Sequence, residues 1–211
     1  MHNKHFIKEP IGWKVMGIIK GFKKKLNLEI TNEKRVEILR KKGLKIGKNV
    51  IIDPTATIDN NYCHLISIGD NCVICGDVKI MAHDSTLKLF TGGYGRAAKV
   101  NIKDNCIISV NSVILPGVTI GPNVLVAAGS VVNKDILPDS CVVGVPARFY
   151  GKFSDYISSH KEKIDTDYVF QRLDSIEDYS EFKKEKRRMI EETEKREIYF
   201  KPGYKYHQFN K

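Results

Sequence analysis

Residues 102–137 read IKDNCIISVNSVILPGVTIGPNVLVAAGSVVNKDIL, and an aliphatic residue returns at every sixth position of this stretch. These residues are Ile102, Ile108, Ile114, Ile120, Val126 and Val132. Four positions after each stands a residue that is usually small, such as Cys106 or Ser130. Because the side chains of an extended chain alternate between its two faces, the first and fifth residues of each hexad point the same way. Glycine, asparagine, aspartate and proline fall between them, where the chain must turn a tight corner.

A six-residue period of this kind predicts a parallel β-helix built from hexapeptide repeats. Three hexads form one triangular coil, so Ile102 is expected to lie against Ile120 of the next coil. Hexads can be followed from Ile46 onward, with a slip of four residues before Ile68 and a sixteen-residue interruption at 86–101. We therefore expect an all-β core of about four coils with one long inserted loop.

The charge of the chain is concentrated at its N-terminus. The 211 residues carry a net charge of +10, and residues 1–45 hold thirteen Lys or Arg against four Asp or Glu. Residues 46–151 hold eight of each. A neutral β-helix without a basic stripe argues against nucleic-acid binding. We expect a basic helical arm at 1–45, a β-helix domain at 46–151 and a helical extension at 152–211.

Helices are expected on both sides of the β-helix. Apolar residues at three- and four-residue spacing over 11–26, with lysines between them, predict an amphipathic helix. It could cover the open end of the β-helix or lie on an anionic membrane surface. A shorter helix should run over 32–42, since Gly43 is a good C-terminal stop. Further helical sequence begins at Phe153, and the charged segment 175–197 predicts a solvated helix.

Cysteine usage and hydropathy indicate the compartment. No apolar run is long enough to span a membrane, and no secretory signal is recognisable. Five cysteines, an odd number, favour a reduced, cytoplasmic setting, with the inner membrane face as an alternative. Cys72 and Cys75 form a CxxC pair, which can indicate redox or metal chemistry. Cys72 occupies an inward position of its hexad, however, so packing is the favoured role.

His83 is the first candidate for catalysis. It is the fourth residue of the hexad that begins at Ile80, so its side chain should point outward. The fourth residue of the hexad one coil earlier is Asn61, which is expected to lie beside it at about 5 Å, the usual strand spacing. An exposed imidazole with an amide neighbour at the start of a long loop is a candidate general base. A surface histidine without a role is the alternative.

The inserted loop is the second candidate. Gly92, Gly93 and Gly95 give it backbone freedom. Phe90 and Tyr94 could offer an apolar face to a sugar ring, and Arg96 and Lys99 could meet an acidic acceptor. Long insertions at the corners of a solenoid tend to be functional. The loop could instead anchor on a neighbouring subunit.

Five motifs stand out between residues 46 and 163. They are ISIGDNCV at 66–73, IMAHDST at 80–86, ILPGVTIG at 114–121, AAGSVVNKDI at 127–136 and GVPAR at 144–148. With these motifs, the sequence over about residues 46–163 resembles the hexapeptide-repeat O-acetyltransferases, which include the maltose, galactoside and streptogramin acetyltransferases and relatives that acetylate capsule and lipopolysaccharide sugars. This resemblance implies a left-handed β-helix, a homotrimer, and transfer of an acetyl group from acetyl-CoA to a hydroxyl, with no metal required.

The resemblance also implies roles for individual residues. The histidine that matches His83 takes the proton from the acceptor hydroxyl, Asn61 helps to place the acceptor or the base, and Asp84 orients the imidazole. Small residues match the pantetheine contacts, and cationic residues match positions near the nucleotide phosphates. These cofactor positions are Ser109, Val110, Ala127, Ala128, Lys134 and Arg148. The implied acceptor is a sugar of a cell-surface polysaccharide or its precursor.

Other functions remain open at this point. An antibiotic or other xenobiotic, or the amine of an amino sugar, could be the acceptor. The β-helix fold also houses a metal-dependent carbonic anhydrase class, but that needs three histidine ligands and the coils hold only His64 and His83. A catalytically silent, partner-binding trimer is a further alternative, because fold alone does not give activity.

Overall fold

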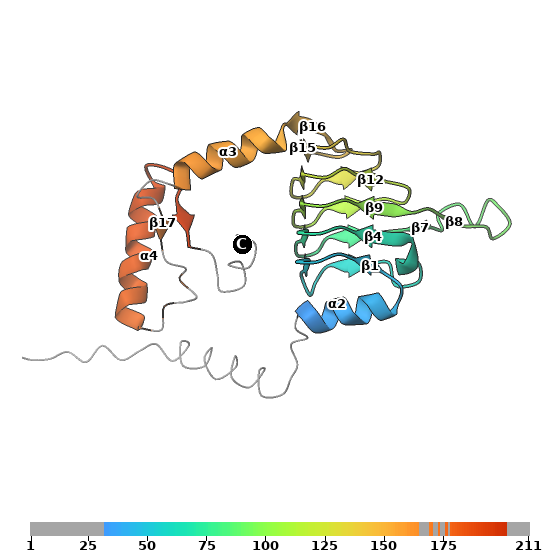
Figure 1. Cartoon of the computed structure of the whole chain (residues 1–211), viewed down its shortest axis with the longest axis horizontal. Coiled ribbons are helices and arrows are strands. Elements are labelled where there is room, and N and C mark those ends of the chain that lie inside the picture. The colour runs from blue at the N-terminus through green and yellow to red at the C-terminus, as the bar shows by residue number, and fades with distance from the viewer. Residues whose placement is uncertain (1–31, 165–168, 171–172, 174–175, 177, 202–211) are drawn as a thin grey trace, which may run out of the picture. The chain divides into compact units, whose positions relative to one another are not determined.

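The computed structural model describes residues 32–164, 169–170, 173, 176 and 178–201 (Figure 1). They fall into two compact units, 32–164 and 169–201. The amphipathic helix expected over 11–26 lies outside the described residues. None of the helices in the described part of the chain is long and apolar enough to cross a membrane.

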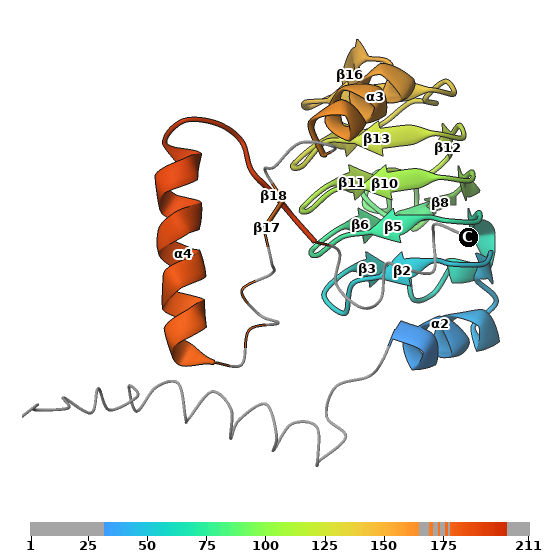
Figure 2. The same ribbon diagram turned by 60° about the vertical axis from the view of Figure 1, so that its left-hand side comes forward.

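The first unit is the parallel β-helix predicted from the sequence, with three sheets (Figures 1 and 2). One sheet contains β1 (Lys45–Ile46), β4 (Ile66–Ile68), β9 (Val100–Ile102) and β12 (Thr119–Ile120). The second contains β2 (Ile51–Ile52), β5 (Val73–Ile74), β10 (Cys106–Ile108), β13 (Val124–Val126), β15 (Ser140–Val143) and β16 (Arg148–Gly151). The third contains β3 (Thr57–Ile58), β6 (Lys79–Ile80), β11 (Val113–Ile114) and β14 (Val131–Val132). Four coils result, and the fold class is the left-handed β-helix of hexapeptide repeats that we expected.

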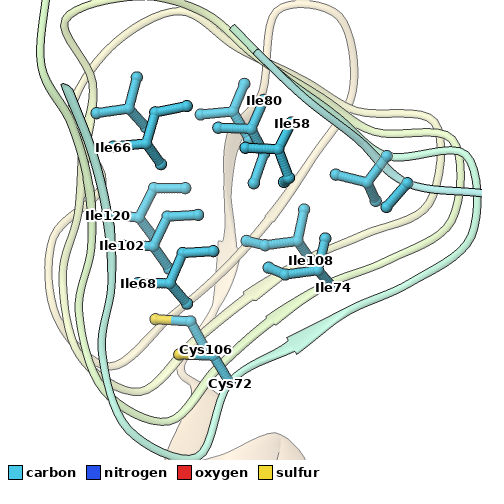
Figure 3. Close-up of a cluster of buried hydrophobic side chains, with 14 of the residues drawn as sticks. Ile58, Ile66, Ile68, Cys72, Ile74, Ile80, Ile102, Cys106, Ile108 and Ile120 are labelled. Atoms are coloured by element: carbon cyan, nitrogen blue, oxygen red, sulfur yellow. The ribbon is translucent and has the colours of Figure 1, made fainter. Parts of the chain in front are cut away.

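Stacked isoleucines fill the interior of the coils. In the first sheet Ile68 pairs with Ile102 and Ile102 with Ile120, as the six-residue period predicts. Figure 3 shows these side chains in one file, with Ile74 and Ile108 in a second file and Ile58 and Ile80 in a third. Each side chain is almost completely buried. Burying one isoleucine stabilises the fold by about 1.5–3 kcal/mol, so the rungs hold the coils together.

The corner between the first and second sheets is built by a column of asparagines. Asn49, Asn71, Asn105 and Asn123 all have positive φ, between 52° and 58°. Their side-chain amides form a ladder: Asn71 Nδ2 donates to Asn105 Oδ1 at 3.1 Å, and Asn105 Nδ2 donates to Asn123 Oδ1 at 2.9 Å. Asparagine tolerates this backbone conformation better than most residues, and the ladder pairs its amide groups. This explains why asparagine recurs at the fourth position of these hexads.

Helix α2 (Asn32–Lys41) covers the first coil and ends before Gly43, as expected. Val36 and Leu39 are buried. Arg35 Nη1 donates to the carbonyl of Pro54 at 2.8 Å, and Arg40 Nη2 donates to the carbonyl of Gly47 at 2.9 Å. Backbone carbonyls at the open edge of the β-helix therefore find partners on this helix.

Helix α3 (Phe153–Ile164) follows β16, which pairs antiparallel with β15. The Asp139 carboxylate accepts from the backbone N–H of Ser154 at 2.7 Å and from its hydroxyl at 2.9 Å, which fixes the first turn of this helix.

The second unit contains a short parallel pair, β17 (Val169–Phe170) with β18 (Tyr199–Phe200), and α4 (Tyr179–Thr193). The Asp178 carboxylate caps α4 by accepting from the backbone N–H of Glu181 at 2.8 Å. The guanidinium of Arg188 lies over the ring of Phe170, 4.2 Å from its centroid. The charged helix expected over 175–197 is therefore present, with shorter bounds.

Candidate active site

The corner after β6 is interrupted by a hairpin that projects from the β-helix (Figure 1). Strands β7 (His83–Asp84) and β8 (Arg96–Ala97) pair antiparallel at its base. The hairpin therefore begins before the expected loop at 86–101, because β7 belongs to it, and the start of β9 already lies within the expected range. Beyond the base the side chains of Leu89, Phe90 and Tyr94 are 78–85% exposed. The hairpin places a long, accessible segment directly after His83.

The imidazole of His83 is held by a buried carboxylate from the coil below. Its Nδ1 contacts Oδ2 of Asp59, whose side chain is 1% exposed. The same Oδ2 accepts from the backbone N–H of Ala82 at 3.0 Å. Oδ1 accepts from the backbone N–H groups of Asn61 and Tyr62, each at 3.2 Å. Each carboxylate oxygen of Asp59 thus has two hydrogen-bonding partners.

These contacts determine which protonation states are favoured. Burial alone would raise the pKa of Asp59, but the bonds from His83, Ala82 and Tyr62 outweigh it and hold that pKa below its ordinary value. An ionised carboxylate at Nδ1 favours the imidazole tautomer with its hydrogen on that nitrogen. Nε2 is then left with its lone pair, and the His83 side chain is 26% exposed. The arrangement can accept a proton from a group that approaches Nε2.

An aromatic ring lies against the imidazole. The centroids of Tyr62 and His83 are 4.7 Å apart, with the ring planes tilted by 32°. Tyr62 is itself 37% exposed. It directly precedes the short 3-10 helix η1 (Cys63–Leu65), in the turn that the Asp59 carboxylate organises. The imidazole is therefore held at Nδ1 and covered by an aromatic ring.

The structure adds a partner of His83 that the sequence analysis did not name. Asn61 was expected to lie beside the histidine, but the paired register of β3 and β6 runs through Ile58 and Ile80, after which the chain turns at Asp59. Asp59, and not Asn61, supplies the side chain that contacts the imidazole; Asn61 contributes its backbone N–H to Asp59. The signal in the sequence was an acidic residue immediately after the strand one coil below.

Asp84 was expected to orient the imidazole, and the structure gives this position to Asp59. The Asp84 carboxylate accepts from the hydroxyl of Thr86, from the backbone N–H of Thr86 at 2.8 Å and from Nε of Arg96 at 3.3 Å. The bonds from Thr86, with a smaller contribution from Arg96, lower the pKa of Asp84 to about 2. Asp84 ties the two strands of the hairpin together at its base.

The predicted cofactor positions lie on more than one corner. Ser109, Val110, Ala127 and Ala128 share the corner between the second and third sheets, where Val110 is 51% exposed. Lys134 lies two coils beyond His83, on the corner that follows the third sheet. Arg148 begins β16 and is exposed. Within one chain, therefore, His83 and the small-residue corner lie at opposite ends of the strands of the third sheet.

The geometry gives little support to redox or metal chemistry at the Cys72–Cys75 pair. Cys72 is completely buried, and its thiol donates to the carbonyl of Lys103 at 3.0 Å. Cys75 lies outside the stacked rungs, and burial raises the pKa of its thiol. Among the described residues, no group of three or more histidine, cysteine, aspartate or glutamate side chains is placed to hold a metal ion.

Comparisons with known proteins agree with the fold. The family model described as bacterial transferase hexapeptide (six repeats) matches residues 99–134. Among solved structures, a hexapeptide-repeat acetyltransferase from Vibrio cholerae O1 biovar eltor, complexed with acetyl coenzyme A, superposes with a TM-score of 0.53 at 26% identity. That superposition covers 62% of this chain and 82% of the other.

Two curated relatives are galactoside O-acetyltransferases. The protein from Escherichia coli K12 is 35% identical over 115 residues, which are 54% of this chain and 56% of the relative. The chain spans about half the length of the first curated relatives it matches. The protein from Lactococcus lactis is 30% identical over 160 residues, which are 64% of this chain and 77% of the relative. With its repeats, coils and this extent of identity, the chain belongs to the hexapeptide-repeat acetyltransferase family that includes the galactoside O-acetyltransferases.

Proposed function

We propose that the protein transfers an acetyl group from acetyl-CoA to a hydroxyl of a sugar, with His83 as the general base. The observation that carries this proposal is the imidazole held at Nδ1 by the buried Asp59, with Nε2 left to accept a proton. Relatives that are galactoside O-acetyltransferases support a sugar hydroxyl as acceptor. The Vibrio cholerae structure complexed with acetyl coenzyme A supports the donor.

The proposed reaction is a direct transfer. Nε2 of His83 takes the proton as the acceptor hydroxyl attacks the thioester carbon, so that a C–O bond forms and a tetrahedral intermediate develops. The C–S bond then breaks, and the imidazolium returns its proton to the departing CoA sulfur. The negative charge of Asp59 stabilises the imidazolium that exists between these steps. General base catalysis of this kind contributes about 10²–10⁴-fold to the rate.

The hairpin after His83 is the proposed acceptor side of the site. Phe90 and Tyr94 are largely exposed and offer apolar surface, while Arg96 at the base pairs with Asp84. Lys99 is a second cation nearby in sequence. We therefore favour an acceptor with a sugar ring and an acidic group, such as a precursor of a cell-surface polysaccharide. We propose that Asn61 helps to place the acceptor in this region.

The cofactor is proposed to bind between subunits of a homotrimer. Within one chain the corner with Val110 and Ala128 precedes the strands of the third sheet, and His83 follows them. A second copy that presents its small-residue corner to His83 would complete the site, with Lys134 and Arg148 near the phosphates of CoA. Sedimentation tests this directly, because a fully active monomer would contradict the proposed assembly.

The experiment that tests the function measures thiol release from acetyl-CoA with a panel of acceptors. The panel contains neutral methyl glycosides, uronic acids, amino sugars and a streptogramin. We expect turnover with a sugar and a product that carries one acetyl ester, which alkali removes. Transfer only to the amine of an amino sugar, or only to the streptogramin, would contradict the proposed acceptor. A protein that neither binds nor consumes acetyl-CoA would contradict the whole proposal.

A further inference from the structure

Tyr62 lies against the imidazole of His83, and the sequence patterns gave it no role. Its backbone N–H donates to Oδ1 of Asp59 at 3.2 Å, while Oδ2 of the same carboxylate contacts Nδ1 of His83. One buried carboxylate therefore holds the imidazole of His83 and the backbone of Tyr62. The centroids of the two rings are 4.7 Å apart. On the other side Tyr62 approaches His64, with the centroids 6.2 Å apart.

The contact has a chemical consequence at the moment when His83 becomes charged. An aromatic face attracts a cation placed over it, and the attraction strengthens when the pair is partly removed from water. His83 is neutral before it takes the proton and an imidazolium afterwards. The ring of Tyr62 interacts more favourably with the second form, so the contact acts chiefly on the charged state. It also limits rotation of the imidazole, because one of its faces is covered.

We propose that Tyr62 is a positioning residue for the acetyl transfer: its ring holds the imidazole of His83 with Nε2 toward the acceptor and stabilises the imidazolium formed in the reaction. This inference rests on the proposed function, because it assigns a role within the same step. It concerns the aromatic ring of Tyr62 and not its hydroxyl. Phenylalanine should therefore replace it, and an aliphatic residue of similar size should not.

Matched variants separate this role from simple packing. Tyr62→Phe keeps the ring, whereas Tyr62→Leu keeps apolar bulk without it. Tyr156→Leu is the control, since Tyr156 on α3 makes a comparable contact with His160, at 4.4 Å between centroids, and is similarly exposed. Neither Tyr156 nor His160 belongs to the proposed site. The control shows what the loss of a tyrosine–histidine contact does elsewhere in the fold.

We expect kcat to depend on whether residue 62 has an aromatic ring. Tyr62→Leu should lower kcat by about 3- to 30-fold with the KM for acetyl-CoA unchanged, which corresponds to the usual strength of a cation–π contact. Tyr62→Phe and Tyr156→Leu should stay within about twofold of the wild type. A folded Tyr62→Leu enzyme that keeps more than half of the wild-type kcat would overturn the proposal. A Tyr62→Phe enzyme as slow as Tyr62→Leu would overturn it too.

A second measurement does not depend on turnover. Nitrogen NMR follows protonation of the His83 imidazole without acetyl-CoA, with the signal assigned by its loss in His83→Ala. In Tyr62→Leu the midpoint should move to lower pH than in the wild type, because the imidazolium has lost a stabilising contact. The other charged neighbours, Asp59 and the Asp84–Arg96 pair, are unchanged in the variant. An unmoved midpoint would overturn the inference. If no acceptor supports transfer, the proposed function fails, and this midpoint still decides whether Tyr62 stabilises the imidazolium.

Discussion

Replacing Asp59 by asparagine removes one charge from the site and almost no volume. The carboxylate has two donors on each oxygen: Ala82 N–H and His83 Nδ1 on Oδ2, and the N–H groups of Asn61 and Tyr62 on Oδ1. An amide has one oxygen and one NH₂ group. In either orientation the NH₂ group therefore faces groups that are donors in the wild-type protein.

The consequence for catalysis follows from the tautomer of His83. If the amide oxygen keeps the bonds to Asn61 and Tyr62, its NH₂ group can bond Nδ1 only when that nitrogen has no hydrogen. The hydrogen then moves to Nε2, and the base is lost. We expect turnover to fall by about 10²–10⁴-fold with the KM for acetyl-CoA unchanged. The N–H of Ala82 is left without its acceptor, which should lower the free energy of unfolding by about 1–3 kcal/mol.

The assay combines thiol release from acetyl-CoA with denaturant unfolding. Asp70→Asn is the matched control, because Asp70 Oδ1 accepts from the backbone N–H of Lys48 at 2.7 Å on a different corner. An amide oxygen can take over that bond, so turnover should stay within about twofold of the wild type. The reasoning would be refuted if folded Asp59→Asn protein kept more than about a tenth of the wild-type turnover.

Three further predictions follow from the same geometry. The folded pKa of Asp59 is lowered, so its contribution to stability is present above the ordinary aspartate pKa of about 3.9 and is lost as the pH falls through the lower folded value. The difference in unfolding free energy between wild type and Asp59→Asn should therefore narrow below about pH 4; a constant difference down to pH 2 would contradict this. Asn105→Ala should destabilise the protein by about 1 kcal/mol more than Asn105→Gly, because both lose the ladder bonds but only alanine is strained at a φ of 57°; equal unfolding free energies would argue against that strain. Replacing residues 86–95 by a short glycine-serine turn should abolish acceptor turnover and keep acetyl-CoA affinity and the proposed trimer. Loss of that assembly would make the hairpin an assembly element.

The six-residue period predicted the fold because it sets strand register directly. Inward isoleucines such as Ile102 and Ile120 pair as the spacing requires, and the number of coils follows from counting hexads. The helices beside the coils were also predictable, since Gly43 marks the end of α2. Strand register, the number of coils and the helix ends follow from local periodicity and turn residues, without knowledge of long-range contacts.

The partner of His83 was not predictable in the same way. Extending the register by three residues beyond Ile58 points to Asn61, but the chain leaves the strand at Asp59 and turns. The turn forms because Oδ1 of Asp59 binds the backbone N–H groups of Asn61 and Tyr62, while Oδ2 of the same carboxylate contacts the histidine one coil above. A corner built by contacts between coils cannot be derived from a repeat. The position of Tyr62 follows from the same turn.

The measurement that tests the central claim most directly is turnover by His83→Ala. From its outward position alone, the sequence predicts a stability change of about 0.5 kcal/mol or less. Because His83 also bonds to buried Asp59, we expect the variant to lose about 1–3 kcal/mol of unfolding free energy. Folding is therefore checked by circular dichroism and acetyl-CoA binding by calorimetry. The account predicts folded protein that binds acetyl-CoA as the wild type does and releases thiol at least about 100-fold more slowly. A folded variant that keeps more than about a tenth of wild-type turnover would show that His83 is not the base.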